Sequence, residues 1–350
     1  MTNLEIAQRR LYNQHIAHQT FTSPVEIVKY MGAIQAQDYA GAKWAVGLRL
    51  QKSNDAAIDK AMANGSIIRT HVLRPTWHFV SPDDLRWMLD LTAPRINASS
   101  ALWYRKLQLD DALFKHSNNT LAMALEGGKQ LSRDEVKDVL QQAGIQTDDL
   151  RFIHLLLRAE LDKVICSGGR QGKQFTYALF EDRVPAGNDF SREEALAELA
   201  KRYFTSHGPA TLHDFSWWSG LTLADAKTGI DSVSSTLTEF KTNGLNYLMA
   251  KNEPDVSEKV PIAHLLPAFD EFAVAYSDRT AAMNPKYVTQ AKRVIFDPSI
   301  VVNNQVVGTW KRAINKNLIT ISFNHFGKIN KTQEKAIESA AAKYRRFVKG

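Results

Sequence analysis

The sequence predicts an α+β fold, mainly α, in which one plan is repeated along the chain. Three segments each contain helices and close with short β-rich runs, and a fourth is largely strand-like. Helices followed by a β-hairpin are typical of winged-helix units. Here the order of the elements repeats, although the amino-acid sequence of the segments does not. We therefore expect winged helices at 1–106, 107–189 and 190–255, and a β-rich C-terminal subdomain with a terminal helix at 256–350.

Capping signals place the helices of the first segment. The first helix is expected from the loose apolar stripe Leu4, Ile6, Leu11 and Ile16. Ser23-Pro24-Val25-Glu26 has the pattern of a capping box, and the helix that it opens is expected to carry its apolar face as far as Ile34. Asp38 can cap a third helix, and a fourth ends at Asn64-Gly65.

Two hairpins are expected to act as wings. SIIRTHVLRPTWHFV reads as two short strands with Arg74-Pro75 near the bend. In the second segment, Ser132 with Glu135 and then Asp149 open helices. KVICSGGRQGKQFTYALF follows as two β-rich runs joined by a basic, glycine-rich loop.

The remaining elements follow the same signals. Ser191 with Glu194 and Thr211 with Asp214 open helices, and a third is expected from Thr222 to Phe240. Asn243-Gly244 then turns into the strand LNYLMAK. HLLPAFDEFAVAYSD, KRVIFDPSIVVNNQVVGTWKR and NLITISFNHF are strand-like, with Asn303-Asn304 as a hairpin turn, and Thr332 begins a basic amphipathic helix.

Composition excludes several classes of protein. The single cysteine, Cys166, allows no intrachain disulfide and no cysteine metal site. A run of about 18 apolar residues, as a membrane span needs, is absent, and the start lacks the order of a secretory signal. We expect a cytoplasmic, nucleoid-associated protein without a cofactor.

Charge is concentrated at the two ends of the chain. Residues 286–350 hold 13 Lys/Arg against 3 Asp/Glu, and residues 1–106 hold 13 against 8, whereas the formal total is only +7. Basic ends around an acidic centre suggest a polyanion held by both ends of the chain. The alternative is that the basic tail is simply a solvated helix.

Two neutral amides, Gln35 and Gln37, flank Ala36 where a helix is expected to end. Residues two apart on a helix point about 200° away from one another, so the pair can share a pocket only if the helix has ended there. A glutamine amide can accept and donate hydrogen bonds but cannot act as a strong base. Such a pair suits a reaction whose leaving group is already primed, unless both glutamines are merely surface residues.

Four stretches carry a resemblance to a known family: MGAIQAQD, RTHVLRPTWHFV, HLLPAFDEFAVAYSDR and VVGTWKR. In this order they resemble the AlkZ-type bacterial DNA glycosylases over almost the whole chain. The resemblance implies tandem winged helices in a C shape around a DNA channel, and removal of N7-alkylated purines or unhooking of interstrand crosslinks. It also implies a catalytic Gln-apolar-Gln motif, which falls on Gln35 and Gln37. A sister branch has Asp in place of the second Gln, and this chain departs from that branch.

Basic and aromatic residues supply candidate DNA contacts. These are Arg69, His71, Arg74, Trp77, Arg170, Lys173, Trp310, Lys311 and Arg312. Arginine suits phosphate and tryptophan suits stacking, and Trp310-Lys311-Arg312 is interpreted as a hairpin tip. The structural alternatives are a strand core for Trp77 and His78, and a solvated strand end for Trp310, Lys311 and Arg312. His71 and His78 could be zinc ligands, but no cysteine and no nearby acidic residue supports a metal site.

Asp270 and Glu271 are the best carboxylate candidates. They could stabilise a cationic transition state, or they could bond backbone amides or pair with Arg279, which is the interpretation we favour. The sequence therefore predicts a monomeric, monofunctional DNA glycosylase acting on N7- or N3-alkylated purines in double-stranded DNA, with crosslinked purines among the candidate substrates. The alternative is a non-catalytic winged-helix DNA-binding protein or transcription regulator.

Overall fold

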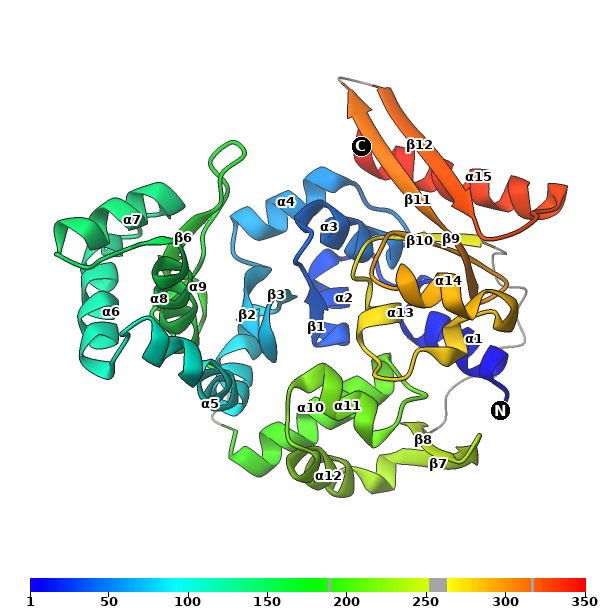
Figure 1. Ribbon diagram of the computed structural model, residues 1–350, viewed down its shortest axis with the longest axis horizontal. Coiled ribbons are helices and arrows are strands. Elements are labelled where there is room, and N and C mark those ends of the chain that lie inside the picture. Colours follow the sequence, from blue (N-terminus) through cyan, green and yellow to red (C-terminus); the bar gives the residue numbers. More distant parts are fainter. Residues whose placement is uncertain (188–189, 252–262, 316–317) are drawn as a thin grey trace. The chain divides into compact units, whose positions relative to one another are not determined.

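The structure is a computed structural model that describes residues 1–187, 190–251, 263–315 and 318–350 (Figure 1). Helices and small antiparallel sheets form two compact units. Unit 1 comprises residues 1–59, 196–218 and 222–350, and unit 2 comprises residues 60–195 and 219–221. The mixed, mainly helical class is as predicted, and the expected segment boundaries at residues 189, 255 and 256 lie outside the described residues.

The first part of unit 1 is helical. Its elements are α1 (Asn3–Asn13), α2 (Pro24–Met31), β1 (Ala33–Gln35), α3 (Tyr39–Leu48) and α4 (Asp55–Ala63), the last of which runs into unit 2. Thr2 and Glu5 form a capping box at α1. The first apolar stripe is only partly right, because Leu4 is exposed and Ile16 lies beyond the helix end. Ser23 and Asp38 are N-caps as predicted, but neither side chain makes a cap hydrogen bond.

The middle of unit 1 holds three helices and a hairpin. The elements are α10 (Arg192–Ser206, which begins in unit 2), α11 (Leu212–Ser219), α12 (Leu223–Ser232), a 3-10 turn (Ser234–Thr236), β7 (Leu237–Thr242) and β8 (Leu245–Ala250). Predicted caps at Ser191 and Thr211 are confirmed. The expected helix from Thr222 to Phe240 is wrong, since α12 ends at Ser232 and Phe240 pairs with Tyr247 in the hairpin.

The last part of unit 1 is a sheet with helices around it. The elements are β9 (Ala263–Leu266), α13 (Glu271–Val274), 3-10 turns at Thr280–Ala282 and Pro285–Tyr287, α14 (Val288–Arg293), β10 (Ser299–Val302), β11 (Gln305–Asn315), β12 (Leu318–His325) and α15 (Lys331–Lys349). The strand order is β12-β11-β10-β9. Asn303 and Asn304 both have positive φ, as a two-residue hairpin turn of this hand requires.

The C-terminal helix packs on α3. Tyr344 and Phe347 of α15 contact the indole of Trp44, with ring centroids 5.1 Å away in each case. A Cβ at Gly47 would meet the Phe347 ring at 2.3 Å, so only glycine lets the two helices approach this closely. The predicted amphipathic helix is confirmed: Ile337, Ala341 and Tyr344 are buried on one face.

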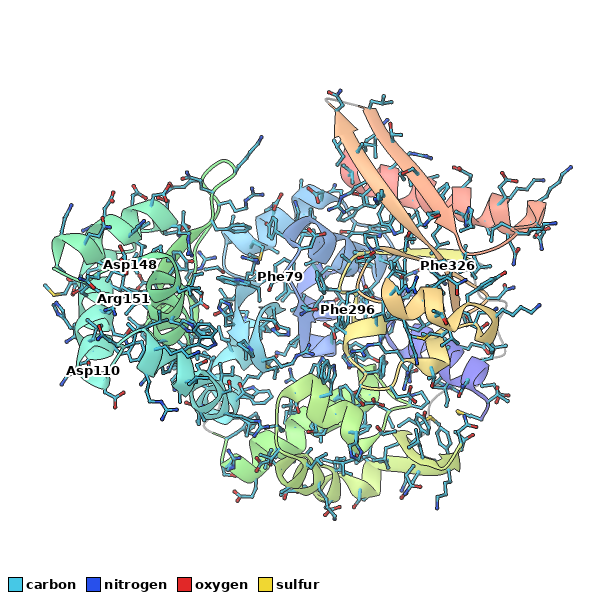
Figure 2. All side chains as sticks on the ribbon, viewed as in Figure 1. Phe79, Asp110, Asp148, Arg151, Phe296 and Phe326 are labelled. Atoms are coloured by element: carbon cyan, nitrogen blue, oxygen red, sulfur yellow. The ribbon has the colours of Figure 1, made fainter. Side chains whose placement is uncertain are left out.

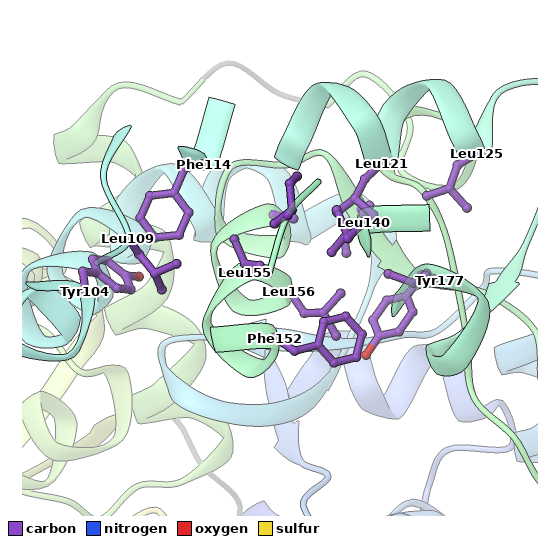
Figure 3. Packing of buried hydrophobic residues seen from close by; sticks show 14 residues of the cluster. Tyr104, Leu109, Phe114, Leu121, Leu125, Leu140, Phe152, Leu155, Leu156 and Tyr177 are labelled. Carbon is purple, nitrogen blue, oxygen red and sulfur yellow. The ribbon is translucent and has the colours of Figure 1, made fainter. Parts of the chain in front are cut away.

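Unit 2 has its own core. Its elements are β2 (Ile68–Val72), β3 (Arg74–Val80), α5 (Pro82–Lys106), α6 (Asp111–Leu125), β4 (Leu131–Ser132), α7 (Arg133–Gln142), α8 (Asp149–Leu161), β5 (Ile165–Ser167), β6 (Thr176–Leu179) and α9 (Phe180–Arg183). Helices α6 to α8 and the β4-β6-β5 sheet enclose a cluster that includes Phe114, Leu121, Leu140 and Phe152 (Figure 3). Asp110, labelled in Figure 2, caps α6 by accepting from the Leu113 amide at 2.8 Å.

Both predicted hairpins of unit 2 are present. β2 and β3 pair around Leu73, which takes a φ of 63° directly before Arg74. β5 and β6 pair as expected, and β4, which the sequence did not indicate, adds a third strand. The capping box of Ser132 and Glu135 is confirmed, and α8 begins at Asp149 as predicted, with Asp148 as its N-cap. None of the helices in the described ranges has the length and apolar character of a membrane-spanning segment.

A buried histidine in β9 makes the stability of unit 1 sensitive to acid. Burial lowers the pKa of His264 from 6.5 to about 4, and Lys343 adds to the effect. The pKa of the folded state is below that of the unfolded chain, so stability is complete above pH 6.5 and falls as the pH drops towards 4. We expect a loss of about 3 kcal/mol over this window, measured by urea denaturation. His264→Leu should lose this contribution, so that its stability falls less over the window than that of wild type, whereas His213→Gln, at an exposed position on α11, should behave like wild type.

Candidate active site around Gln35 and Glu271

The Gln-Ala-Gln motif lies on an extended segment between two helices. Gly32, with a φ of 76°, ends α2 after Met31, and Gln35 is the last residue of the short strand β1. The expected helical face through Ile34 is therefore wrong. The requirement that the helix ends before the motif is met, because α2 ends at Met31 and β1 begins at Ala33, two residues before Gln35.

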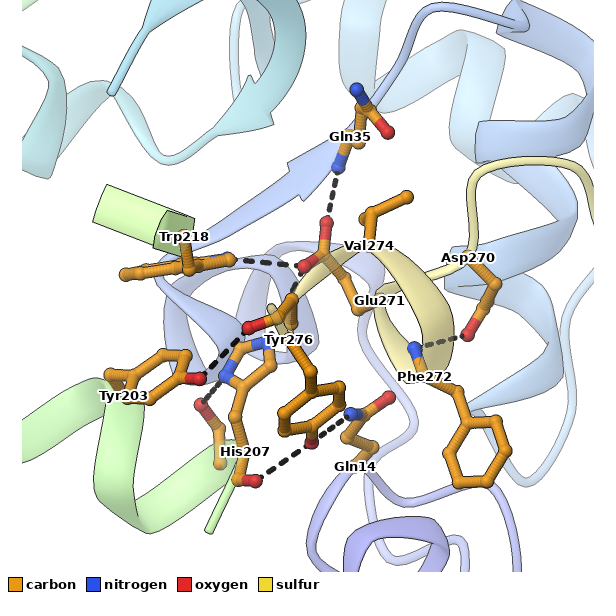
Figure 4. Close-up of polar contacts among 12 residues, drawn as sticks. Gln14, Gln35, Tyr203, His207, Trp218, Asp270, Glu271, Phe272, Val274 and Tyr276 are labelled. Atoms are coloured by element: carbon orange, nitrogen blue, oxygen red, sulfur yellow. Dashed lines mark hydrogen bonds and ion pairs between the residues drawn. The ribbon is translucent and has the colours of Figure 1, made fainter. Parts of the chain in front are cut away.

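A buried carboxylate holds the motif from behind. Glu271 is fully buried and accepts a hydrogen bond from the backbone N–H of Gln35 at 2.7 Å (Figure 4). Its second oxygen accepts from the Trp218 indole at 3.1 Å and lies 3.5 Å from Nε2 of His207. Two N–H donors, the backbone amide of Gln35 and the indole of Trp218, are thus directed at one buried carboxylate.

The two glutamine side chains differ in exposure. Gln35 is 9% exposed, and its Oε1 has no hydrogen-bond partner among the residues that the structure describes. Gln37 lies in the bend after β1 and is exposed. A buried acceptor without a partner is costly, so it is a position where a bound ligand or a water molecule would supply the missing donor.

Asp270 anchors the short helix that carries Glu271. Its carboxylate accepts two hydrogen bonds from Arg49, each at 2.9 Å, and a third from the Phe272 amide at the start of α13. Arg49 and Asp270 are both buried, and Arg49 also donates to Gln14 at 2.8 Å. The structural interpretation is thus supported, but the predicted partner Arg279 was wrong: Arg49 holds Asp270.

Uncharged aromatic and imidazole groups surround this carboxylate. Burial lowers the pKa of His207, which stacks on Tyr203 at 5.0 Å. Burial also raises the pKa of Tyr203, whose hydroxyl donates to the Ala275 carbonyl at 2.8 Å. Tyr276 donates to the carbonyl of His207 at 2.7 Å.

The first hairpin candidates are fixed by contacts within unit 2. The Arg69 guanidinium lies 4.2 Å from the Trp77 ring, and His71 bonds the buried carboxylate of Glu160. The sequence interpretation that His71 has no acidic neighbour was wrong, because Glu160 is remote in the chain. His78 is fully buried in β3, in agreement with the strand-core alternative. In the described ranges, no group of three His, Cys, Asp or Glu residues could hold a metal ion.

The other basic candidates lie in different places. Arg170 and Lys173 occupy the loop between β5 and β6, where Arg170 donates to the Lys173 carbonyl at 3.0 Å. Arg74 is half-buried at the start of β3. In unit 1, Lys311 is exposed and the Arg312 guanidinium lies 3.6 Å from the carboxylate of Asp38, directly after the motif.

Trp310 is not at a hairpin tip. It lies in the middle of β11, is 1% exposed, and donates to the Leu266 carbonyl at 2.8 Å. The predicted placement was wrong because β11 continues to Asn315, five residues further than the tryptophan. Its contact with Tyr344 makes it part of the core beneath α15.

Three residues of the site gave no signal in the sequence. Arg49 ends α3 without a motif around it, and His207 follows α10 without an acidic neighbour. Trp218 of α11 is fully buried, and its indole bond to Glu271 could not be foreseen from the sequence. Trp217 beside it is 46% exposed.

Comparison with known proteins assigns the class. The family model described as "DNA glycosylase AlkZ-like" matches residues 28–347. The chain belongs to this family, which confirms that it is a DNA glycosylase, an enzyme class that hydrolyses N-glycosyl bonds.

The curated protein and the solved structure that match this chain are both from Streptomyces sahachiroi. The "Interstrand DNA cross-link repair glycosylase" of that organism is 22% identical over 355 residues, covering 95% of this chain and 93% of the relative. The solved structure of its "DNA glycosylase AlkZ" matches with a TM-score of 0.81 at 21% identity, over 99% of this chain and 96% of that one. At 21% identity, the similarity to this solved structure establishes the fold of the chain and no more.

Proposed function

We propose that the chain hydrolyses the N-glycosidic bond of N7- or N3-alkylated purines in double-stranded DNA, including purines of interstrand crosslinks. Purines of interstrand crosslinks are included because the Streptomyces relative is named an interstrand cross-link repair glycosylase. Gln35 and Gln37 position the water and the deoxyribose, and Glu271 supplies fixed negative charge. The enzyme acts as a monomer, and its three helical segments serve as winged helices.

One observation carries the proposal: the buried Oε1 of Gln35 lacks a donor within the described residues, while the same residue's N–H is held by Glu271. The backbone of Gln35 is therefore fixed, and its side chain presents an acceptor that something else must satisfy. A nucleophilic water or a sugar or base group of the substrate has the required donor.

The chemistry suits a neutral pair of amides. An N7-alkylpurine carries a positive charge, so when its bond to C1′ breaks, the electron pair neutralises the base and no general acid is needed. Water attacks C1′, forms the new C–O bond and loses a proton to solvent, which leaves an abasic deoxyribose. The sugar is cationic in the transition state, and a nearby fixed carboxylate stabilises that charge.

The electrostatic balance supports a DNA substrate. The formal charge of +7 and the 13 Lys/Arg of residues 286–350 favour binding of a polyanion. Arg312 beside Asp38 places one of these cations next to the motif. Candidate phosphate contacts therefore occur in the same unit as Gln35.

The test is release of 7-methylguanine from a methylated duplex under single-turnover conditions. Gln35→Ala/Gln37→Ala should slow release about a hundredfold, because each lost hydrogen bond costs about 1.4 kcal/mol or tenfold in rate. The affinity for DNA should stay within about twofold.

The matched control is Gln51→Ala/Gln290→Ala, which removes two exposed glutamines from unit 1 and should react at the wild-type rate. Full activity of the motif variant would contradict the role of the two glutamines. A wild-type protein that binds alkylated and crosslinked duplexes but releases no base would instead be a non-catalytic binding protein.

A further inference from the structure

Unit 2 contains a cleft with a volume of about 410 Å³ that the proposed chemistry does not use. It lies among the β2–β3 hairpin, the start of α7 and strand β6. The lining residues that matter here are Arg69, Trp77, Arg133, Asp134, Lys173 and Phe175. The volume is in the range of small-molecule sites.

The cleft contains one rigidly held cation. Arg69 is only 7% exposed, and its guanidinium lies 4.2 Å from the Trp77 ring and 4.6 Å from the Phe175 ring. Its backbone N–H donates to Ser167 at 2.9 Å. Two aromatic rings thus fix the guanidinium before any ligand arrives, which reduces the entropy lost on binding.

Two further cations border the same space. Arg133 lies over the Phe152 ring at 4.6 Å, and Lys173 is exposed in the loop between β5 and β6. Asp134 is the acidic residue among those that line the cleft, which leaves a surplus of two positive charges. An arginine held by rings with two neighbouring cations is suited to a phosphate group.

Size and lining extend the ligand beyond phosphate. A phosphate group fills only a small part of the cleft, and Trp77, Phe175 and the buried Tyr177 line much of the remainder. We propose that this cleft binds a nucleoside monophosphate unit, with the phosphate at Arg69, Arg133 and Lys173 and the base in the aromatic part. A base can enter such a cleft only when it is unpaired.

The two sources of this unit are a nucleotide within a DNA strand and a free mononucleotide. The cleft thus adds a binding site to the proposed function. Its ligand requires no damaged base, so binding of undamaged DNA tests it. Failure of the cleft and failure of the Gln35 assignment are therefore distinguishable.

The experiment measures binding of a fluorescent oligothymidylate by anisotropy. Arg133→Gln/Lys173→Gln should weaken binding about tenfold and lower the salt slope by roughly 0.7 for each cation removed. The matched control, Arg105→Gln/Lys115→Gln, removes the same two side-chain types from exposed positions of unit 2 outside the cleft. Its affinity should change by less than about twofold.

Asp134→Asn adds a test of opposite sign. Removing this carboxylate should tighten oligothymidylate binding, because it lies beside the proposed phosphate position and repels it. Equal losses in the cleft and control variants, or weaker binding by Asp134→Asn, would overturn the proposal.

Competition identifies the source of the nucleotide. Thymidine monophosphate should displace the oligothymidylate from wild type more effectively than thymidine or inorganic phosphate. If only binding of the mononucleotide, measured by calorimetry, depends on Arg133 and Lys173, the ligand is a free nucleotide. If both depend on them, the cleft takes a nucleotide of the strand. If neither oligothymidylate binding nor mononucleotide binding depends on Arg133 and Lys173, the proposed site is contradicted.

Discussion

Replacing Glu271 by glutamine is expected to slow base excision by a hundredfold to a thousandfold while DNA affinity stays within about twofold. This magnitude is typical of removing one preorganised electrostatic group from an active site. Glu271 is fully buried and its carboxylate bonds the Gln35 amide at 2.7 Å. The glutamine variant keeps the shape of the side chain but loses the negative charge beside the proposed reaction centre.

The geometry also predicts a defect in positioning. A glutamine at 271 has one acceptor oxygen, whereas the carboxylate accepts from both Gln35 and Trp218. One donor is then left without its partner, and the backbone of β1 is held less firmly. In the proposed mechanism Glu271 therefore acts through Gln35, which is the residue proposed to contact the substrate.

The measurement is the single-turnover rate of 7-methylguanine release, together with the Kd for the same duplex. Glu334→Gln, at an exposed position of α15, is the matched control and should be as active as wild type. Glu271→Asp retains the charge and should recover part of the lost rate. A Glu271→Gln protein that excises normally, or one that loses DNA affinity and rate together, would contradict this role.

Arg49→Met is expected to destabilise unit 1 by about 3–5 kcal/mol, the usual cost of leaving a buried carboxylate unpaired. The Arg49 guanidinium makes two hydrogen bonds of 2.9 Å to Asp270, and both groups are shielded from water. Methionine is long enough to fill much of the space but cannot neutralise the acid. Urea denaturation of the purified protein measures the loss.

A double substitution separates the ion pair from packing. Arg49→Met/Asp270→Leu removes both charges, and it should recover a large part of the stability lost by Arg49→Met alone. Arg202→Met, at a partly exposed position paired with Glu198, is the control and should cost no more than about 1 kcal/mol. Equal destabilisation by the two single variants would show that burial of Asp270 is not the cause.

Local signals predicted most of the helices and hairpins. Ser132, Ser191 and Thr211 cap helices as their patterns indicate, because a capping box involves residues only three apart. Asn303 and Asn304 likewise form the expected turn. The prediction of a single helix from Thr222 to Phe240 was wrong. The sequence has no strong stop signal between Ser232, where α12 ends, and Phe240, which pairs across the β7–β8 hairpin.

The candidate site could be predicted only in part. The motif itself and the acidic pair were visible, but the contact between Gln35 and Glu271 joins residues 236 positions apart. Arg49 is 221 residues from Asp270, and no local pattern reports such a pairing. Trp310 was misplaced for a related reason: its neighbours Lys311 and Arg312 look like a surface end, whereas Tyr344 and Leu266 bury the indole.

The close approach of α15 to α3 has a consequence for biosynthesis. Trp44 is covered by Tyr344 and Phe347, which the ribosome adds after the residues from Gln35 to Glu271. A nascent chain therefore carries both glutamines and their carboxylate before the helix that covers α3 exists. Unit 1 therefore cannot complete its packing around Trp44 until Tyr344 and Phe347 have been synthesised, and we expect the site to reach its final geometry only after that point.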